Sequence, residues 1–280
     1  MHFTQKLQQA VQSSGSNLCV GLDPVLHKIP SPLKERFRDD TTLILNFCKQ
    51  IIEATKTVCC AYKPNTAFFE AFGSKGWEAL EQVIDSIPTG KIIIADAKRG
   101  DIGSTAEQYR KAFFDHLNVD AVTLNPLMGI DTIEPFLGDS SKAVFVLAIT
   151  SNPGSADFLQ RRFEGRLSLA AYIAEHLAKM QKKHSTHIGL VAGATHPEEI
   201  GNIVQQMPEA TLLIPGIGSQ GGSMQELADV LKHHKGLPIV SSSRSILYAG
   251  GDEENWLDFV SQKAIDTGNQ LKSLLHEPQA

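Results

Sequence analysis

The sequence predicts an α/β protein in which residues 1–280 form a single domain, a (β/α)8 barrel of the TIM type. Short β-rich runs alternate with longer amphipathic segments along the chain, as the strands and helices of such a barrel do. Several β-rich runs are almost wholly apolar, which is typical of parallel strands covered on both faces. The 280 residues suit one barrel of about 250 residues, and no Pro/Gly/Ser-rich linker divides them.

Eight segments are expected to be strands. In chain order they are Leu18–Leu22, Val58–Tyr62, Ile92–Asp96, Ala121–Leu124, Ala143–Ile149, Ile188–Val191, Leu212–Ile214 and Pro238–Val240. The expected helices are Thr41–Thr55, Gly76–Ile87, Ser104–Leu117, Leu167–Lys183, Pro197–Gln206, Ser223–His233 and Glu254–Leu275. The segment Gly21–Phe37 contains three prolines and is predicted to be a long loop after the first strand, where barrels carry catalytic residues.

Composition argues against several classes of partner. The net charge is −5 and no Lys/Arg run is present, so we expect no nucleic-acid partner. The longest apolar runs have strand length and Met1–Ala10 is polar and amphipathic, which predicts neither a membrane span nor a signal peptide. The four cysteines have no CxxC spacing, and we interpret them as buried thiols of a protein in the reducing cytoplasm.

Polar residues recur where the predicted strands end. They are Asp23, Lys63, Asp96, Lys98, Asn125, Thr150, Ser151 and Arg244. The carboxyl ends of all strands in a barrel meet on one face, so residues far apart in the chain can share a pocket there.

The densest polar cluster is Asp96–Ile102, directly after an apolar strand. Asp96 and Lys98 are two residues apart and point the same way if strand geometry persists. Asp101 follows Gly100, where the chain can turn. Together with Lys63, these side chains supply two ammonium groups and two carboxylates that could alternate in space, and buried charges are tolerated when each touches an opposite charge. The alternative is a solvated surface motif, which the preceding apolar strand disfavours.

A second cluster is glycine-rich and follows the seventh predicted strand. Pro215–Gly222 contains four glycines, and Ser243 and Arg244 follow the eighth strand. Barrels often bind phosphate in these two loops, where backbone N–H groups approach the anion and arginine adds a bidentate contact. The sequence therefore predicts a phosphorylated ligand rather than an ordinary glycine-rich turn.

Taken together, these motifs resemble orotidine 5′-monophosphate decarboxylase, in its longer bacterial (type 2) branch. The resemblance runs in order from about residue 17 to residue 248 and is carried by Val20–Pro24, Lys63–Asn65, Asp96–Ile102, Pro215–Gly218, Gln220–Gly222 and Ser243–Arg244. It implies decarboxylation of orotidine 5′-monophosphate to UMP and carbon dioxide, the last step of de novo UMP biosynthesis. It also implies that the reaction needs no metal and no cofactor.

The resemblance also implies roles for catalytic residues. Lys98 matches the lysine that delivers a proton to the ring carbon, and Asp96 matches the carboxylate facing the departing carboxylate. Lys63 matches the lysine that links this network to the ribose. Asp101 matches a residue that reaches the neighbouring subunit's site, as does the substrate-binding Thr105, so a homodimer with shared active sites is expected.

The remaining substrate contacts follow from the same resemblance. Asp23 matches the aspartate that binds a ribose hydroxyl, and Ser151 matches the serine at the pyrimidine edge. The phosphate would be held by Gln220, Gly221, Ser243 and Arg244. Ser243 stands where many relatives carry glycine, and its backbone N–H remains available to the phosphate.

Three other readings remain beside this one. A related barrel could be a magnesium-dependent keto-sugar-phosphate decarboxylase or hexulose-phosphate synthase, and an aldolase could use Lys63 or Lys98 as a Schiff base. A non-catalytic phosphonucleotide-binding barrel is the third, which the complete charged set disfavours. His184 and His187 are interpreted as histidines near a helix end rather than as a metal pair.

Overall fold

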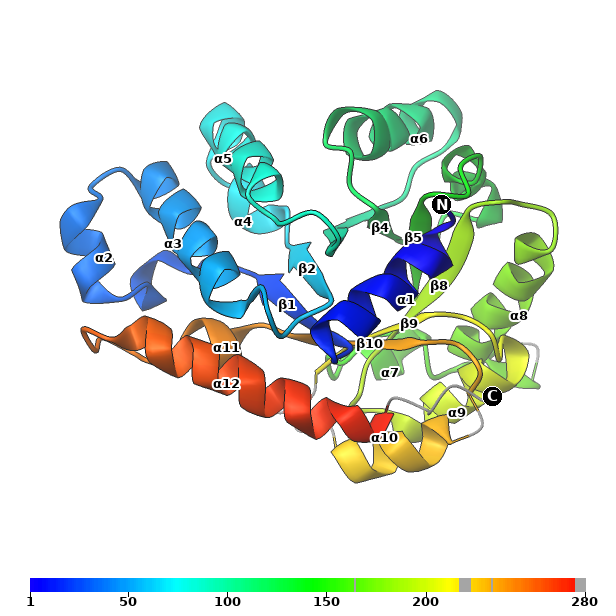
Figure 1. The fold of residues 1–280 in the computed structure, drawn as a ribbon. Helices are drawn as coiled ribbons and strands as arrows, with labels where there is room; N and C mark the ends of the chain where they lie inside the picture. The colour runs from blue at the N-terminus through cyan, green and yellow to red at the C-terminus, as the bar shows by residue number, and fades with distance from the viewer. Residues whose placement is uncertain (164, 217–222, 233, 275–280) are drawn as a thin grey trace.

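The centre of the molecule is a closed barrel of eight parallel strands. The computed structural model describes residues 1–163, 165–216, 223–232 and 234–274. The strands follow one another around the barrel in the order β1-β10-β9-β8-β5-β4-β3-β2. The ring closes because β1 (Leu18–Leu22) pairs with both β10 (Pro238–Ser242) and β2 (Ala61–Pro64). Figure 1 shows the first and last strands at the centre of the fold, and the predicted (β/α)8 barrel is confirmed.

Each of the eight predicted strands is present. The others are β3 (Ile92–Arg99), β4 (Ala121–Leu124), β5 (Ala143–Ile149), β8 (His187–Ala192) and β9 (Leu212–Pro215). The largest difference is in β2, which begins three residues later than predicted and extends to Pro64, so that Lys63 lies within the strand.

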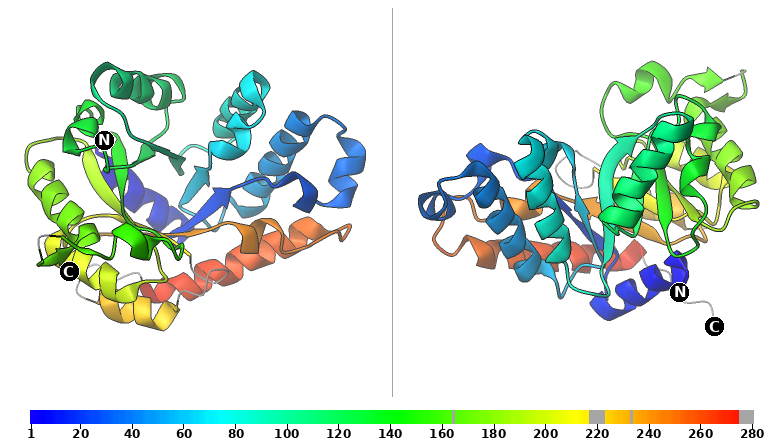
Figure 2. Two further views of the ribbon diagram at one scale, coloured as in Figure 1. Left: turned by 180° about the vertical axis from the view of Figure 1, so that it is seen from behind. Right: turned by 90° about the horizontal axis from the view of Figure 1, so that it is seen from above.

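The predicted helices surround the barrel wall (Figures 1 and 2). They are α3 (Asp40–Thr55), α5 (Gly73–Asp85), α6 (Gly103–Arg110), α8 (Leu169–Gln181), α9 (Pro197–Gln206), α10 (Met224–Leu231) and α12 (Trp256–Leu271). A π-helical turn, Lys111–His116, continues α6, and the predicted ends at His233 and Leu275 fall outside the described residues. None of the helices in the described ranges has the length and apolar character needed to cross a membrane.

Two segments contain more regular structure than predicted. Gly21–Phe37 includes a 3-10 turn (Leu26–Lys28) and α2 (Ser31–Arg36), because Pro32 lies in the first turn of α2, where its missing N–H is harmless. Leu167 was predicted to begin a helix but belongs to a hairpin, β6 (Arg162–Phe163) with β7 (Leu167–Ser168), at the top right of Figure 2. The following helix begins at Leu169 because the Ser168 side chain accepts a hydrogen bond from the N–H of Ala171.

An N-terminal helix, α1 (Phe3–Ser14), closes the amino-terminal end of the barrel, and it was not predicted. Its apolar side chains Phe3, Leu7 and Val11 are buried against barrel residues near the beginnings of the strands. Phe3 stacks edge-on against Phe145 of β5, with 6.2 Å between ring centroids. The lower half of the barrel is therefore filled with apolar side chains, which leaves the carboxyl ends of the strands for polar groups.

All four cysteines are buried free thiols, as predicted. Cys59 packs into the core between strands and helices, whereas Cys60 packs into the barrel interior with Cys19. The two neighbouring thiols therefore face different surroundings. Burial raises the pKa of Cys59 to about 11 and that of Cys19 to about 12, so these thiols stay protonated and unreactive at neutral pH.

Candidate active site

A pocket of about 280 Å³ opens at the carboxyl ends of the strands. Its lining includes seven of the residues predicted for the site, contributed by the ends of five different strands. They are Asp23, Lys63, Asp96, Lys98, Ser151, Ser243 and Arg244. The barrel thus brings together residues that are more than two hundred positions apart in the chain.

Asp96 lies between two lysines at the bottom of this pocket. Its Oδ2 is 2.6 Å from Lys63 Nζ, and its Oδ1 is 2.5 Å from Lys98 Nζ. The side chains of Lys63 and Asp96 are only 8% and 10% exposed, whereas that of Lys98 is 48% exposed. The buried pair is therefore the fixed part of the network, and the ammonium group of Lys98 reaches into the space that a ligand could occupy.

The two buried members of the network shift each other's pKa. Burial alone would lower the pKa of Lys63, but the charges of Asp96 and Asp23 outweigh burial and raise that pKa above its usual value. Burial alone would raise the pKa of Asp96, but the charges of Lys63 and Lys98 outweigh it and hold that pKa well below its usual range. Lys63 and Asp96 are therefore both charged at neutral pH.

Lys98 reaches Asp96 through an irregular backbone rather than through the pleat of a regular strand. The pairing of β3 with β4 shifts register between Ala95 and Arg99, and Lys98 has a left-handed φ of 49°. Its N–H donates to Thr123 Oγ1 at 2.9 Å, and the Thr123 hydroxyl donates to Asp96 Oδ1 at 3.1 Å. A non-glycine residue in this region costs about 1–3 kcal/mol, and such strain gathers at functional sites.

Thr123 was not predicted as a site residue, although it lines the pocket. The signal in the sequence is a single polar residue inside the apolar strand Ala121–Leu124. Only the pairing of β4 with β3 reveals that this hydroxyl faces Asp96. Asn152, which lines the pocket beside Ser151, was also not predicted.

Asp23 follows β1, the strand next to β2, and is fixed from two sides. Its Oδ2 accepts a hydrogen bond from the Ser243 hydroxyl, and its backbone carbonyl accepts one from the Tyr248 hydroxyl at 2.9 Å. Burial raises the pKa of Tyr248 to about 12, which keeps this donor protonated. Asp23 Oδ1 is enclosed but has no hydrogen-bond partner within the described part of the chain. Asp23 lines the pocket, and a hydrogen bond from a ligand hydroxyl would satisfy this oxygen.

Gly21 allows Ser243 to approach Asp23. A Cβ atom on Gly21 would lie 2.9 Å from the Cβ atom of Ser243, closer than real contacts allow. Gly21 thus allows β1 to lie close to the segment that follows β10.

The predicted phosphate end is described in part. Gly216 and Arg244 line the pocket after β9 and β10, and Gly216 has a φ of 99°, which favours glycine. The side chain of Arg244 is exposed and has no ion-pair partner in the described ranges. Gln220 and Gly221 lie outside the described residues.

Asp101 and Thr105 do not line the pocket of their own chain. Asp101 Oδ1 accepts a hydrogen bond from the neighbouring N–H of Ile102 at 2.8 Å, and Thr105 is exposed on α6. The chain turns outward at Gly100, whose backbone is packed so closely that a Cβ atom would lie 2.6 Å from Asn125 O. The structure therefore assembles three of the four predicted charges within one chain.

The structure places His187 in the barrel wall. His187 is the first residue of β8 rather than part of a helix end, so that interpretation was wrong for it. Its ring stacks on Phe3 and its Nε2 is 2.8 Å from Thr211 Oγ1, and burial lowers its pKa to about 4. Within the described ranges, no three His, Cys, Asp or Glu side chains are grouped so that they could hold a metal ion.

Comparison with known proteins agrees with this geometry. The model of the orotidine 5′-phosphate decarboxylase / HUMPS family matches residues 16–259. A Herpetosiphon aurantiacus protein named orotidine 5′-phosphate decarboxylase is 49% identical over 250 residues, which cover 89% of this chain and 90% of that protein. A protein of the same name from Dehalococcoides mccartyi (strain CBDB1) is 38% identical over 279 residues, which cover 99% of this chain and 98% of that protein.

The solved structure of Leishmania donovani OMP decarboxylase is 34% identical and covers 98% of both chains, with a TM-score of 0.81. Family model, relatives and structure agree over nearly the same span of residues. The chain therefore belongs to the orotidine 5′-phosphate decarboxylase / HUMPS family.

Proposed function

We propose that this protein converts orotidine 5′-monophosphate to UMP and carbon dioxide, the last step of de novo UMP biosynthesis. The observation that carries the proposal is the chain of charges Lys63–Asp96–Lys98, placed in a pocket that has Arg244 on another side. The names of the relatives support the same activity. The protein would need no cofactor, because its own charged groups can stabilise the transition state.

Lys98 would stabilise and then protonate the carbanion. When the bond between C6 and the carboxylate breaks, its electron pair stays on C6 in the plane of the ring, where delocalisation cannot absorb it. An ammonium group held beside C6 meets this developing charge and then donates a proton to it. Solvent returns the proton to the amine. The half-exposed side chain of Lys98 suits both steps.

Asp96 would act on the departing carboxylate. Both of its oxygens are engaged by lysines, and its lowered pKa keeps it ionised beside a second carboxylate. Repulsion between the two carboxylates disappears as neutral carbon dioxide leaves. Lys63 would hold Asp96 in place and extend the network towards the ribose.

The remaining contacts would bind the nucleotide. Asp23 Oδ1 would accept a hydrogen bond from a ribose hydroxyl, and Ser151 would contact the edge of the pyrimidine ring. The phosphate would be held by Gln220, Gly221, Ser243 and Arg244. Phosphate contacts far from C6 can contribute to catalysis when their binding energy closes the site over the substrate.

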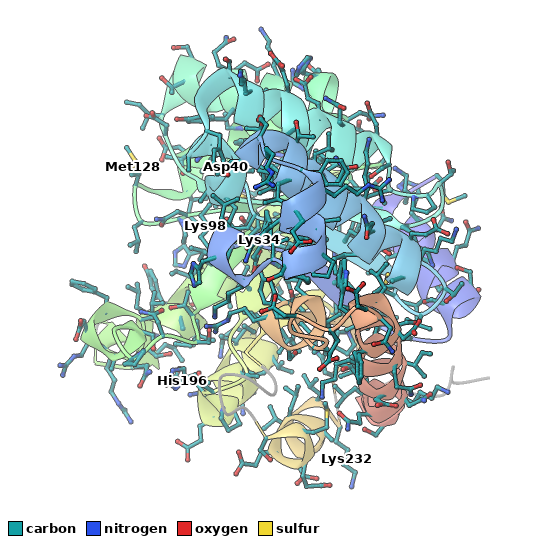
Figure 3. All side chains as sticks on the ribbon, turned by 90° about the vertical axis from the view of Figure 1, so that its left-hand side faces the viewer. Lys34, Asp40, Lys98, Met128, His196 and Lys232 are labelled. Carbon is teal, nitrogen blue, oxygen red and sulfur yellow. The ribbon has the colours of Figure 1, made fainter. Side chains whose placement is uncertain are left out.

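We further propose that the protein acts as a homodimer in the cytoplasm, in which Asp101 and Thr105 complete the partner's site. Neither residue lines the pocket of its own chain, and Ile102, Leu127 and Met128 are 57%, 61% and 56% exposed. The labelled Met128 lies at the outline of the molecule in Figure 3. A second copy would cover this apolar surface. The buried free cysteines suit a reducing compartment.

Mixing two inactive variants tests the shared site. Lys98→Ala and Asp101→Ala homodimers should each be inactive. A refolded equal mixture should regain roughly a quarter of wild-type activity, because each mixed dimer keeps one site with both native residues. A mixture that stays inactive would count against shared sites.

The reaction itself is tested by following the ultraviolet absorbance of the pyrimidine ring. Purified protein is mixed with orotidine 5′-monophosphate with and without EDTA, and Lys98→Ala is the control. We expect turnover that resists EDTA and is lost in the variant. Turnover abolished by EDTA would favour the magnesium-dependent relatives, and binding without turnover by the wild type would favour a phosphonucleotide-binding barrel.

A further inference from the structure

The segment Ser151–Ser155 crosses the edge of the pocket between β5 and α7 (Ser155–Phe158). Ser151 and Asn152 line the pocket, and residues 152–154 are exposed to solvent. Within the segment, the N–H of Ser155 donates to Asn152 O at 3.1 Å, which makes a turn. The side-chain contacts that tie the segment to the neighbouring turn after β8 are at its two ends, Ser151 and Ser155.

Two consecutive residues, Thr195 and His196, contact the two ends of this segment. The turn joins β8 to α9, and its Thr195 Oγ1 donates a hydrogen bond to the carbonyl oxygen of Ser151 at 3.2 Å. The next residue, His196, has its Nε2 3.1 Å from Ser155 Oγ. Ser155 is only 3% exposed, and His196 is partly buried. Figure 3 shows His196 on the same side of the molecule as Lys98.

A third side chain, Gln160, joins this contact. Its side-chain amide donates to Ser155 Oγ at 2.9 Å, and the same nitrogen lies 3.4 Å from both ring nitrogens of His196. Ser155, Gln160 and His196 thus form one hydrogen-bonded cluster at the far end of the segment.

The turn that carries these residues is itself fixed to two strands. The N–H of Gly193 donates to Ile149 O at 2.8 Å, and the N–H of Ala194 donates to Pro215 O at 2.9 Å. Gly193 also packs so tightly that a Cβ atom there would lie 2.6 Å from Ser151 N. The turn cannot shift without disturbing β5 and β9, so it is a rigid support for the exposed segment.

We infer that Thr195 and His196 are positioning residues that hold Ser151 and Asn152 against the pyrimidine ring. Neither residue belongs to the pocket lining, so both would act through the segment Ser151–Ser155. The inference rests on the proposed function, because it assigns the ring of the nucleotide to this side of the pocket. It predicts that the two residues matter for the ring and not for the sugar phosphate.

Binding of two ligands distinguishes these contributions. UMP carries the ring, whereas ribose 5-phosphate lacks it and retains the sugar and phosphate. Thr195→Val removes the hydroxyl donor with little change in shape, and His196→Leu removes the ring nitrogen that contacts Ser155 Oγ. We expect each to weaken UMP binding about fivefold, the effect of one neutral hydrogen bond, and to leave ribose 5-phosphate binding unchanged in calorimetry.

Conservative variants provide the matched controls. Thr195→Ser keeps the hydroxyl and His196→Gln keeps a polar group near the position of Nε2, so both should bind UMP within about twofold of wild type. Thr267→Val removes a similar hydroxyl-to-carbonyl bond on α12, far from the pocket, and should change neither ligand.

The outcomes separate the inference from the proposed function. Equal weakening of both ligands would reveal a general structural role and overturn the inference, as would unchanged UMP binding in Thr195→Val and His196→Leu. If His196→Leu fails to fold, the Thr195 variants decide alone. A wild-type protein that binds ribose 5-phosphate but not UMP would refute the proposed function, and the inference with it.

Discussion

Replacing Asp96 by asparagine should destabilise the protein far more than removing Lys98, although both changes should abolish turnover. Asp96→Asn preserves the shape of the side chain but leaves the ammonium group of Lys63, 8% exposed, without the carboxylate that it contacts at 2.6 Å. Removing one member of a buried ion pair costs about 3–5 kcal/mol. At about 2 °C per kcal/mol for a chain of this size, Tm should fall by roughly 6–10 °C.

Lys98→Met is the matched control, because it removes the other lysine from the same carboxylate. The Lys98 side chain is 48% exposed, and Asp96 keeps its contacts with Lys63 and Thr123. An ion pair this exposed contributes about 0–1 kcal/mol, so Tm should change by roughly 2 °C at most. Differential scanning calorimetry at pH 7 measures both variants, and the ultraviolet assay measures turnover.

The dependence on pH follows from the directions of the two pKa shifts. The pKa of Asp96 is lowered in the folded protein, so its contribution is present above about pH 4 and is lost as pH falls further. The pKa of Lys63 is raised, so its contribution is present below about pH 10 and is lost as pH rises through the folded-state value. The difference in Tm between wild type and Asp96→Asn should therefore be constant near neutral pH and shrink in acid. Equal losses of Tm for Asp96→Asn and Lys98→Met would refute the reasoning.

Three further changes test other parts of the structure. Arg244→Ala should weaken UMP binding roughly tenfold to a hundredfold, the effect of a charge-assisted contact, and leave uridine binding unchanged in calorimetry. Burial lowers the folded-state pKa of His187 to about 4, so the unfolded chain binds more protons and stability is lost as pH falls from about 6.5 towards 4. His187→Gln should flatten that part of a plot of urea midpoint against pH, and an unchanged slope would show that His187 is not the group responsible. Phe3→Ala removes a fully buried ring from α1 and should reduce the free energy of unfolding by about 3–5 kcal/mol in urea titrations while kcat at 25 °C stays near wild type; a matching loss of kcat would link α1 to the pocket.

Residues at strand ends could be predicted because the barrel itself places them. Lys63, Asp96 and Arg244 each follow or end a recognisable apolar strand, and closure of the ring brings those ends together. Thr123 could not be assigned from sequence, because its role depends on the register of β4 against β3. The left-handed backbone of Lys98 could not be predicted either. A regular strand would also bring the Lys98 side chain towards Asp96, so nothing in the sequence indicates an irregular backbone there.

Other features depend on contacts between distant loops. Thr195 and His196 come directly before the predicted helix Pro197–Gln206, and nothing in their neighbours in the sequence indicates that they reach Ser151 and Ser155. The helical spacing of Phe3, Leu7 and Val11 is visible in the sequence, but where that apolar face docks is decided by the barrel.

The helix α1 closes one end of the barrel to small molecules. Its apolar side chains fill the amino-terminal end, and among the described residues the charged pocket opens at the carboxyl ends of the strands. Substrate would enter, and nucleotide and carbon dioxide would leave, past the loops at that end. Any loop that folds over a bound ligand also blocks both departures until it reopens. At saturating substrate, reopening of such a loop can then limit kcat. In that case kcat would depend on solvent viscosity and not on substituents that change the stability of the ring carbanion.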